Sequence, residues 1–242
     1  MIDSVVLLLL SVAGAAAHGA PMAYFLLAFD DVDGPDWPQK FENYSLFVAS
    51  PTHFTASHVK KVHDTIPGSR VLAYMDTIDV ALKYGCSTGS PMGNLPIQRR
   101  LPDDPDGYYK QLRQGFKHEW LMRNLSDNGA PVCYFPGLAA MCMMKESADF
   151  LVRFHKQVTI DEYNFDGIYQ DMLDANYYWL GHDFTTIDSD GDGKPNTAKD
   201  IGAQWHGWRN YYIKELRAAV GDDKIIVASC VSERGSNAPR MC

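Results

Sequence analysis

The chain has 242 residues, of which 46% are hydrophobic and 21% are charged, and its formal net charge is −8. A chain of this length can form one large globular domain or two small ones, with a sizeable core. Because no basic run exceeds two consecutive residues, the composition argues against a surface that binds nucleic acid or an anionic membrane.

The N-terminal segment is typical of a secretory signal peptide. Val5 to Ala17 is apolar, is too short to span a bilayer, and ends in three consecutive alanines. It departs from the usual pattern because only Asp3, and no basic residue, precedes the apolar run. We expect residues 1–17 to be removed and residues 18–242 to form a soluble domain that is secreted or lumenal and has no membrane segment.

Cysteines and glycosylation sequons fit the same oxidising compartment. The five cysteines are Cys86, Cys133, Cys142, Cys230 and Cys242. None forms a CxxC pair, so a zinc site is not expected, and two disulfides with one free thiol are compatible with the count. Cys133 and Cys142 flank a Pro-Gly turn and could close a short loop, although their spacing does not fix the pairing. Asn43 and Asn124 begin N-x-S sequons and are predicted glycosylation sites.

Strand-like runs alternate with helical patterns along the chain. We expect strands at residues 23–29, 44–49, 70–75, 165–170 and 224–228. We expect helices at residues 55–66, 108–115, 147–163 and 201–220. This rhythm is typical of parallel βα units, which form either a closed barrel or an open doubly wound sheet. No GxGxxG motif follows the first strand, so the sequence does not support a dinucleotide-binding fold.

Two long connections follow predicted strands, at residues 77–146 and 173–200. Both leave carboxyl ends of strands, the side on which active-site loops grow in βα proteins. Within the first connection we expect a hairpin in which residues 119–122 pair with residues 132–135 and the chain turns at residues 127–129.

Two sequence blocks resemble glycoside hydrolases of the TIM-barrel superfamily. The first is Glu119-Trp120-Leu121 with Asp127-Asn128-Gly129 and Pro131-Val132; the second is Phe165-Asp166-Gly167-Ile168-Tyr169-Gln170-Asp171. In those families a hairpin of the first kind precedes a fourth strand of the second kind. The resemblance implies a (β/α)8 TIM-barrel-like fold. Since the chain supplies about five strands, we expect the barrel to be incomplete at the C-terminus, through truncation of the chain or through closure by a partner.

Carboxylates end several of the predicted strands. Asp171 is the first candidate catalytic residue, because chemistry in parallel barrels lies where strands end and the resemblance places a family carboxylate there. Glycoside hydrolysis usually requires two carboxylates that flank the scissile bond. Asp76 ends the third strand and Glu233 follows the fifth, so both are candidates for the second carboxylate. Asp30 ends the first strand and is a candidate substrate contact. Each of them could instead be a loop cap or a solvated loop residue.

Aromatic side chains near these strand ends are candidate platforms for sugar rings. They have flat apolar faces and, in tyrosine and tryptophan, a polar edge. The candidates are Tyr74, Trp120, Tyr177, Tyr178 and Trp179. Packing in the core or in a loop is the alternative for each of them.

Residues 188–196 resemble a calcium-binding loop. Their D-x-D-x-D-G pattern places oxygen ligands at positions 1, 3 and 5 and a glycine at position 6, where the chain turns sharply. The predicted metal ligands are Asp188, Asp190, Asp192, the carbonyl of Lys194, and Asn196. The acidic residue of an EF-hand at position 12 is replaced by Lys199, with Asp200 one place later. We expect a structural Ca²⁺ that holds an active-site loop, and a solvated acidic turn is the alternative.

Together these patterns predict a secreted glycosidase-like barrel. Its partner would be a carbohydrate, and paired carboxylates would cleave O-glycosidic bonds of a polysaccharide or glycoconjugate by acid/base chemistry. A non-catalytic, carbohydrate-binding pseudo-enzyme is the main alternative, favoured by the five-strand count if Cys242 is the true end of the chain. A calcium-stabilised extracellular module is a third hypothesis, supported by the loop at Asp188 alone.

Overall fold

The computed structural model describes residues 22–26, 34, 37–51, 54–77, 79–81, 107–135, 138–171, 173 and 184–228. The predicted signal peptide at residues 1–17 lies outside the described residues. So do five of the candidate site residues, namely Asp30, Tyr177, Tyr178, Trp179 and Glu233.

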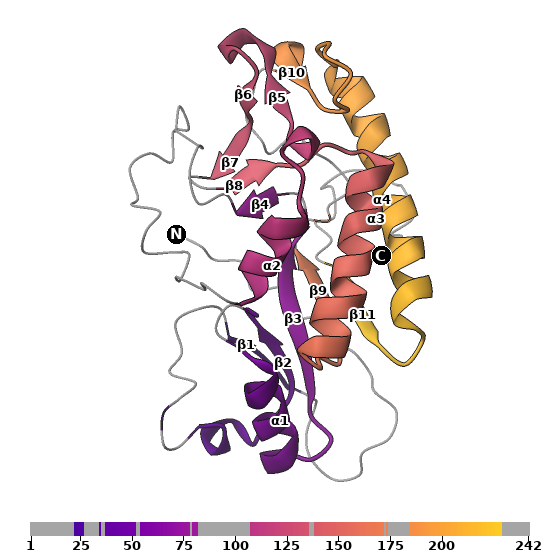
Figure 1. The fold of residues 1–242 in the computed structure, drawn as a ribbon. Helices are drawn as coiled ribbons and strands as arrows, with labels where there is room; N and C mark the ends of the chain where they lie inside the picture. Colours follow the sequence, from indigo (N-terminus) through magenta and orange to yellow (C-terminus); the bar gives the residue numbers. More distant parts are fainter. Residues whose placement is uncertain are drawn as a thin grey trace.

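A parallel sheet of five strands forms the centre of the described chain (Figure 1). Its strands are β1 (Met22–Leu26), β2 (Tyr44–Ala49), β3 (Arg70–Asp76), β9 (Gly167–Asp171) and β11 (Ile225–Ala228). The strand order is β1-β2-β3-β9-β11, and all neighbours run parallel. The sheet confirms the predicted α/β fold, and the observed strands overlap the five that the sequence predicts.

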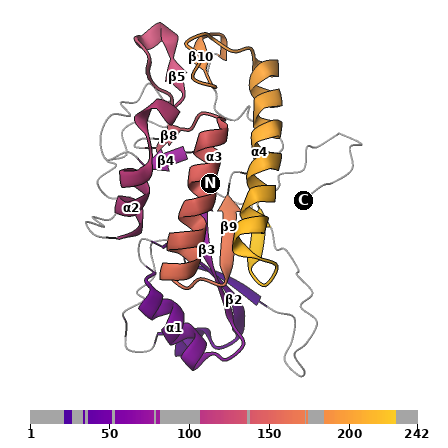
Figure 2. The same ribbon diagram turned by 45° about the vertical axis from the view of Figure 1, so that its right-hand side comes forward.

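Helices cover one face of this sheet. They are α1 (Ala56–Thr65), α3 (Lys145–Phe154) with its continuation as a π-helix (His155–Glu162), and α4 (Ala198–Val220). In Figure 2, α3 and α4 stand side by side in front of β9. The helix that the sequence predicts over residues 147–163 is therefore present, but its second half is wound as a π-helix rather than an α-helix.

The helices begin and end where the sequence provides local signals. Thr55 and His58 form a capping box at the start of α1, and Thr197 and Asp200 form one at the start of α4. These side chains satisfy backbone N–H groups that have no partner within the helix. Helix α4 ends at Gly221, whose φ of 86° is costly for residues with a Cβ atom.

Two small antiparallel sheets lie beyond the end of the central sheet (Figure 1), and their strands come from the two long connections. One has the order β10-β5-β6 and the other β4-β8-β7. Their strands are β4 (Asp79–Ala81), β5 (Arg123–Asn124), β6 (Ala130–Pro131), β7 (Cys133–Phe135), β8 (Leu138–Ala140) and β10 (Ile187–Asp188). Helix α2 (Tyr108–Gly115) lies between β4 and β5 in the chain and has the bounds that the sequence predicts.

The predicted hairpin exists, but its pairing was predicted partly wrongly. Strand β5 pairs with β6 around a tight turn in which Asn128 and Gly129 both have positive φ. Trp120 lies in a 3-10 helix (His118–Trp120) instead of a strand, and β7 pairs with β8. The side chain of Asn124 accepts hydrogen bonds from the backbone N–H and the hydroxyl of Ser126. These local bonds stabilise the turn that joins β5 to β6.

The loop closure between Cys133 and Cys142, which the sequence allows without fixing, is not formed. Cys142 is a buried free thiol, whereas Cys133 is disulfide-bonded, so these two cysteines are not bonded to each other. Burial raises the pKa of the Cys142 thiol to about 12, so this side chain stays protonated and behaves as a small core residue.

No helix within the described ranges has both the length and the apolar character that a membrane span requires.

Candidate active site

Alternation along β3 separates core residues from site residues. The side chains of Val71, Ala73 and Met75 belong to the hydrophobic clusters beneath the helices. Because successive side chains of a strand point to opposite faces, Tyr74 and Asp76 lie on the face that the helices do not cover. Both side chains are half-buried.

Strand β9 repeats this pattern beside β3. Ile168 packs in the core under α3 and α4, so Tyr169 and Asp171 lie on the same uncovered face as the site residues of β3. Tyr74 is paired in register with Tyr169, and Asp76 with Asp171. Neighbouring strands lie about 4.8 Å apart, so Asp76 and Asp171 are neighbours at the carboxyl edge of the sheet. Tyr74 and Tyr169 lie two residues earlier on the same strands.

A hydrogen bond links the two strands across this face. The hydroxyl of Tyr74 donates to Oδ2 of Asp171. The rings of Tyr74 and Tyr169 are stacked, with centroids 5.9 Å apart and planes 15° from parallel. This stacking restricts the Tyr74 ring and thereby the direction of its hydroxyl.

The electrostatics of the site keep Tyr74 protonated. Burial, followed by the negative charge of Asp171 and the hydrogen bond to it, raises the pKa of Tyr74 well above its usual range, and the charge of Asp76 acts in the same direction. A phenolate here would be poorly solvated and would lie beside carboxylates. Tyr74 therefore serves as a hydrogen-bond donor and not as a base at ordinary pH.

Tyr169 is the member of this group that sequence reasoning did not single out. The signal was present, because a residue two places before Asp171 in a strand shares its face, as Tyr74 does with Asp76.

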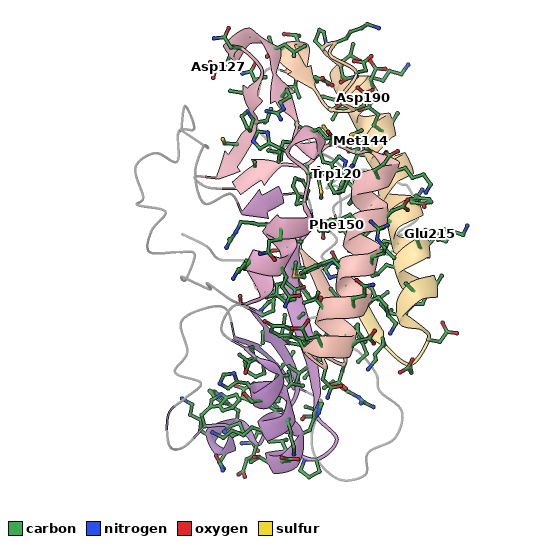
Figure 3. The ribbon with its side chains drawn as sticks, in the orientation of Figure 1. Trp120, Asp127, Met144, Phe150, Asp190 and Glu215 are labelled. Carbon is green, nitrogen blue, oxygen red and sulfur yellow. The ribbon has the colours of Figure 1, made fainter. Side chains whose placement is uncertain are left out.

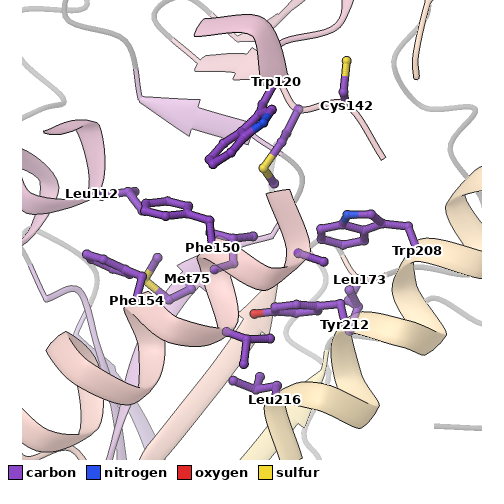
Figure 4. Close-up of a cluster of buried hydrophobic side chains, with 14 of the residues drawn as sticks. Met75, Leu112, Trp120, Cys142, Phe150, Phe154, Leu173, Trp208, Tyr212 and Leu216 are labelled. Atoms are coloured by element: carbon purple, nitrogen blue, oxygen red, sulfur yellow. The ribbon is translucent and has the colours of Figure 1, made fainter. Parts of the chain in front are cut away.

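Trp120 is placed differently from its predicted role. Its ring is 5% exposed and packs against Phe116 and Phe150, with ring centroids 5.4 and 5.5 Å away. Figure 4 shows Trp120 above Phe150 within the hydrophobic cluster. A side chain enclosed in this way presents no face to a sugar, so core packing, the alternative left open by the sequence, describes Trp120.

The amino end of β9 has a carboxylate with a different environment. Oδ2 of Asp166 accepts a hydrogen bond from the backbone N–H of Val71 at 2.8 Å and lies 2.8 Å from Nε2 of His63. Its Oδ1 accepts from the guanidinium of Arg70 at 3.2 Å. The side chain is 13% exposed. Asp166 thus ties together α1, β3 and the start of β9, at the opposite end of the strand from Asp171.

Gly167 has a packing role in the same motif. A Cβ atom at this position would lie 2.0 Å from the carbonyl oxygen of Ile225 on β11. Any side chain would therefore force β9 and β11 apart. Asp166 and Gly167 therefore contribute to the packing of the sheet, while Asp171, at the end of the same motif, lies in the candidate site.

The acidic loop at residues 188–194 is the second cluster of interest. Carboxylate oxygens of Asp188, Asp190 and Asp192 lie within 4.8 Å of one another. Asp188 is 3% exposed, and its carboxylate accepts hydrogen bonds from the backbone of Gly191 at 2.7 Å and of Gly193 at 2.9 Å. Both glycines have positive φ. Figure 3 places Asp190 next to the start of α4, beyond the end of the central sheet.

The other predicted metal ligands are engaged elsewhere to different degrees. Oδ1 of Asn196 accepts hydrogen bonds from the backbone and hydroxyl of Ser189. Asp200, the acidic residue nearest to position 12, caps α4 through Thr197. The ammonium of Lys194 lies 3.7 Å from the carboxylate of Asp192. Three carboxylates can therefore hold a cation, while Asn196 would have to turn its amide to contribute its oxygen.

The sequence has no match among protein-family models, and no curated protein matches it either. Solved structures do resemble it. The structure of a cycloisomaltooligosaccharide glucanotransferase from Paenibacillus sp., complexed with cycloisomaltoheptaose, aligns with a TM-score of 0.54 and 12% identity over 86% of this chain and 30% of that chain. The structure of the glycoside hydrolase domain of PelA from Pseudomonas aeruginosa aligns with a TM-score of 0.48 and 11% identity over 85% of this chain and 58% of that chain.

At these identities the likeness concerns the fold alone, and the alignment with the glucanotransferase carries it. The chain is thus a TIM-barrel-like α/β domain that spans less than two thirds of the length of either structure. Within the described residues, β1 and β11 form the two edges of the parallel sheet.

Proposed function

We propose that this chain is part of a secreted glycoside hydrolase that cleaves O-glycosidic bonds of a polysaccharide or glycoconjugate. Asp171 is one catalytic carboxylate and Asp76 is the candidate for the second. The observation that carries the proposal is their pairing in register at the carboxyl edge of a TIM-barrel-like sheet, on the face opposite the helices. Two carboxylates close together, one to handle a proton and one to stabilise or attack the anomeric carbon, are what glycoside hydrolysis needs.

The tyrosine pair favours a carbohydrate over other substrates. Tyr74 and Tyr169 lie next to the carboxylates on the same face, so they offer aromatic surface and hydroxyl groups within one site. Sugars are recognised by this combination of apolar ring faces and polar edges. The glucanotransferase that shares the fold was solved with a cyclic oligosaccharide, which agrees with this choice of substrate class.

A comparison of carboxylate variants tests this function. Purified wild type, Asp171→Asn and Asp76→Asn are incubated with dextran, xylan, pectin and chitosan, and the release of reducing ends is measured. Asp222→Asn is the matched control, because Asp222 is an exposed carboxylate near the amino end of β11. We expect the wild type and Asp222→Asn to cleave at least one polymer at the same rate, and Asp171→Asn to lose about 10²- to 10⁴-fold in rate.

A binding protein without catalysis is the second candidate function. It is favoured by the stacked pair Tyr74 and Tyr169, because aromatic rings can bind sugars whether or not a bond is cleaved. If the wild type binds a polymer but releases no reducing ends, and Asp171→Asn binds equally well, the pseudo-enzyme is correct and the hydrolase is not.

We also propose that the loop at Asp188 binds a structural Ca²⁺. Three carboxylates within 4.8 Å supply the hard, anionic oxygen ligands that Ca²⁺ prefers, and the carbonyl of Lys194 is the fourth candidate ligand. The ion would offset the mutual repulsion of these carboxylates and fix the connection between β10 and α4.

The proposed secretion rests on the predicted signal peptide at residues 1–17, and N-terminal sequencing of the exported protein tests it.

A further inference from the structure

Tyr74 stands between the two parts of the candidate site. It lies on β3, two residues before Asp76, while its hydroxyl reaches diagonally across to Asp171 on β9. A hydrogen bond in this direction fixes the rotation of the Asp171 carboxylate, because Oδ2 must face the phenol.

The Tyr74 ring is itself held in place. It stacks on Tyr169 at a centroid distance of 5.9 Å, and the two strands that carry the rings are paired in register on both sides of this position. The position of the Tyr74 hydroxyl is therefore fixed, and the Asp171 carboxylate must rotate to accept its hydrogen bond. The raised pKa of Tyr74 agrees with a permanent donor.

We propose that Tyr74 is a positioning residue whose hydroxyl orients the Asp171 carboxylate toward the glycosidic bond. This inference rests on the proposed hydrolase function and deepens it. Preorganised groups accelerate reactions because the cost of orienting them is met during folding and not at the moment of reaction. Tyr74 then acts through Asp171 and is not a nucleophile or a base.

The test compares Tyr74→Phe with Tyr211→Phe, which is its matched control. The hydroxyl of Tyr211 also donates to an aspartate, Asp149, at 2.6 Å, but this hydrogen bond joins helices α4 and α3 and not the strands of the site. On a polymer that the wild type cleaves, we expect Tyr74→Phe to lower kcat about 10- to 100-fold, as for hydrogen bonds to charged groups, with KM nearly unchanged. Its pH profile should also differ from that of the wild type, because the hydroxyl that donates to the Asp171 carboxylate is lost. Tyr211→Phe should keep the wild-type kcat and pH profile.

A second readout needs no substrate. The Tyr74 hydroxyl proton should give a downfield proton NMR resonance in the wild type and in Tyr211→Phe. This resonance should be absent from Tyr74→Phe and should move upfield in Asp171→Asn, because a neutral amide oxygen accepts a weaker hydrogen bond than a carboxylate. If Tyr74→Phe does not fold, 4-fluorophenylalanine at position 74 keeps the ring size without a donor, and 4-aminophenylalanine restores a donor and should rescue kcat.

The two proposals fail in different ways. If Asp171→Asn abolishes turnover but Tyr74→Phe keeps the wild-type kcat and pH profile, the positioning role is wrong and the hydrolase stands. A hydroxyl resonance that keeps its wild-type position in Asp171→Asn likewise contradicts the positioning role. If the wild type and Asp171→Asn behave identically on all four polymers, the hydrolase is wrong, and the positioning role is wrong with it.

Discussion

The two ends of β9 carry the same residue type in different roles. Asp166, at the amino end, accepts hydrogen bonds from the Val71 backbone and the Arg70 guanidinium, and it lies beside the His63 ring. Asp171, at the carboxyl end, accepts from the hydroxyl of Tyr74 and is paired in register with a second carboxylate. The first aspartate has partners that fix it within the fold, whereas the second is placed next to a like charge. Carboxylates that serve stability are surrounded by donors, and those that serve chemistry are held near other acids.

The largest expected effect on stability comes from a substitution of Gly167, which lies in β9 between Asp166 and Asp171. Gly167→Ala should destabilise the protein by about 3 to 5 kcal/mol or prevent folding, because its Cβ would overlap the carbonyl of Ile225 at 2.0 Å. Gly202→Ala, in α4, has open space around the new Cβ and should stabilise by about 0.5 to 1 kcal/mol. Urea unfolding monitored by circular dichroism measures both. A stable Gly167→Ala would show that β9 and β11 do not approach so closely.

The next effect separates the two aspartates. Asp166→Asn should lower the free energy of unfolding by about 1 to 3 kcal/mol, because the carboxamide places an N–H against one of the donors that the carboxylate now accepts from. Asp171→Asn should change this free energy little, since it removes a negative charge beside Asp76. The same urea experiment compares them, and equal losses in the two variants would erase the distinction between the ends of the strand.

A third prediction concerns the loss of folding stability at low pH. This loss must be known before a pH profile of activity can be assigned to the candidate site. Burial lowers the pKa of His155 to about 3, below its value of about 6.5 in the unfolded chain. The unfolded state therefore binds the proton more readily, and this contribution to stability is complete above pH 6.5 and is lost as the pH falls from there toward 3.

Between pH 7 and pH 5 the loss from His155 should be about 2 kcal/mol. In His155→Gln this part of the pH dependence should disappear, whereas the exposed His206→Gln should keep it. Unfolding curves at a series of pH values decide, and an unchanged slope in His155→Gln would contradict the prediction. Activity profiles of the Asp171 site are best read above pH 6.5, where this contribution is constant.

The smallest effect belongs to the acidic loop. Ca²⁺ at ten times its dissociation constant should stabilise the protein by about 1.4 kcal/mol relative to the chelated form, seen as a higher Tm. Asp190→Asn should abolish this response, while Asp161→Asn, on the surface of the π-helix, should keep it. A Tm that is the same with Ca²⁺ and with chelator would leave the loop as a solvated acidic turn.

Local sequence patterns predicted most of the secondary structure correctly. Alternation and helical spacing placed all five parallel strands and α2, because hydrophobic periodicity reports directly on which face of each element is buried. They also placed Asp76 and Asp171 at strand ends, but they could not show that the two are register partners, because register between strands about 90 residues apart depends on the packing of the whole sheet.

Contacts of longer range account for the errors. Trp120 was a sugar-platform candidate because tryptophan suits both cores and binding sites, and only its enclosure by Phe116 and Phe150 decides between them. The pairing of Cys133 with Cys142 followed from their closeness in sequence, whereas Cys142 is a buried free thiol. The role of Asp166 was hidden for the same reason, since its partners come from α1 and β3.

The most direct test of the central claim is the turnover of Asp166→Asn and Asp171→Asn, measured per folded molecule at a temperature where both are folded, on the polymer that the wild type cleaves. We expect Asp166→Asn to retain a kcat close to that of the wild type, and Asp171→Asn to lose about 10²- to 10⁴-fold in kcat. If Asp171→Asn turns over normally, or if both variants lose activity to the same degree, the assignment of structure to one end of β9 and chemistry to the other is wrong.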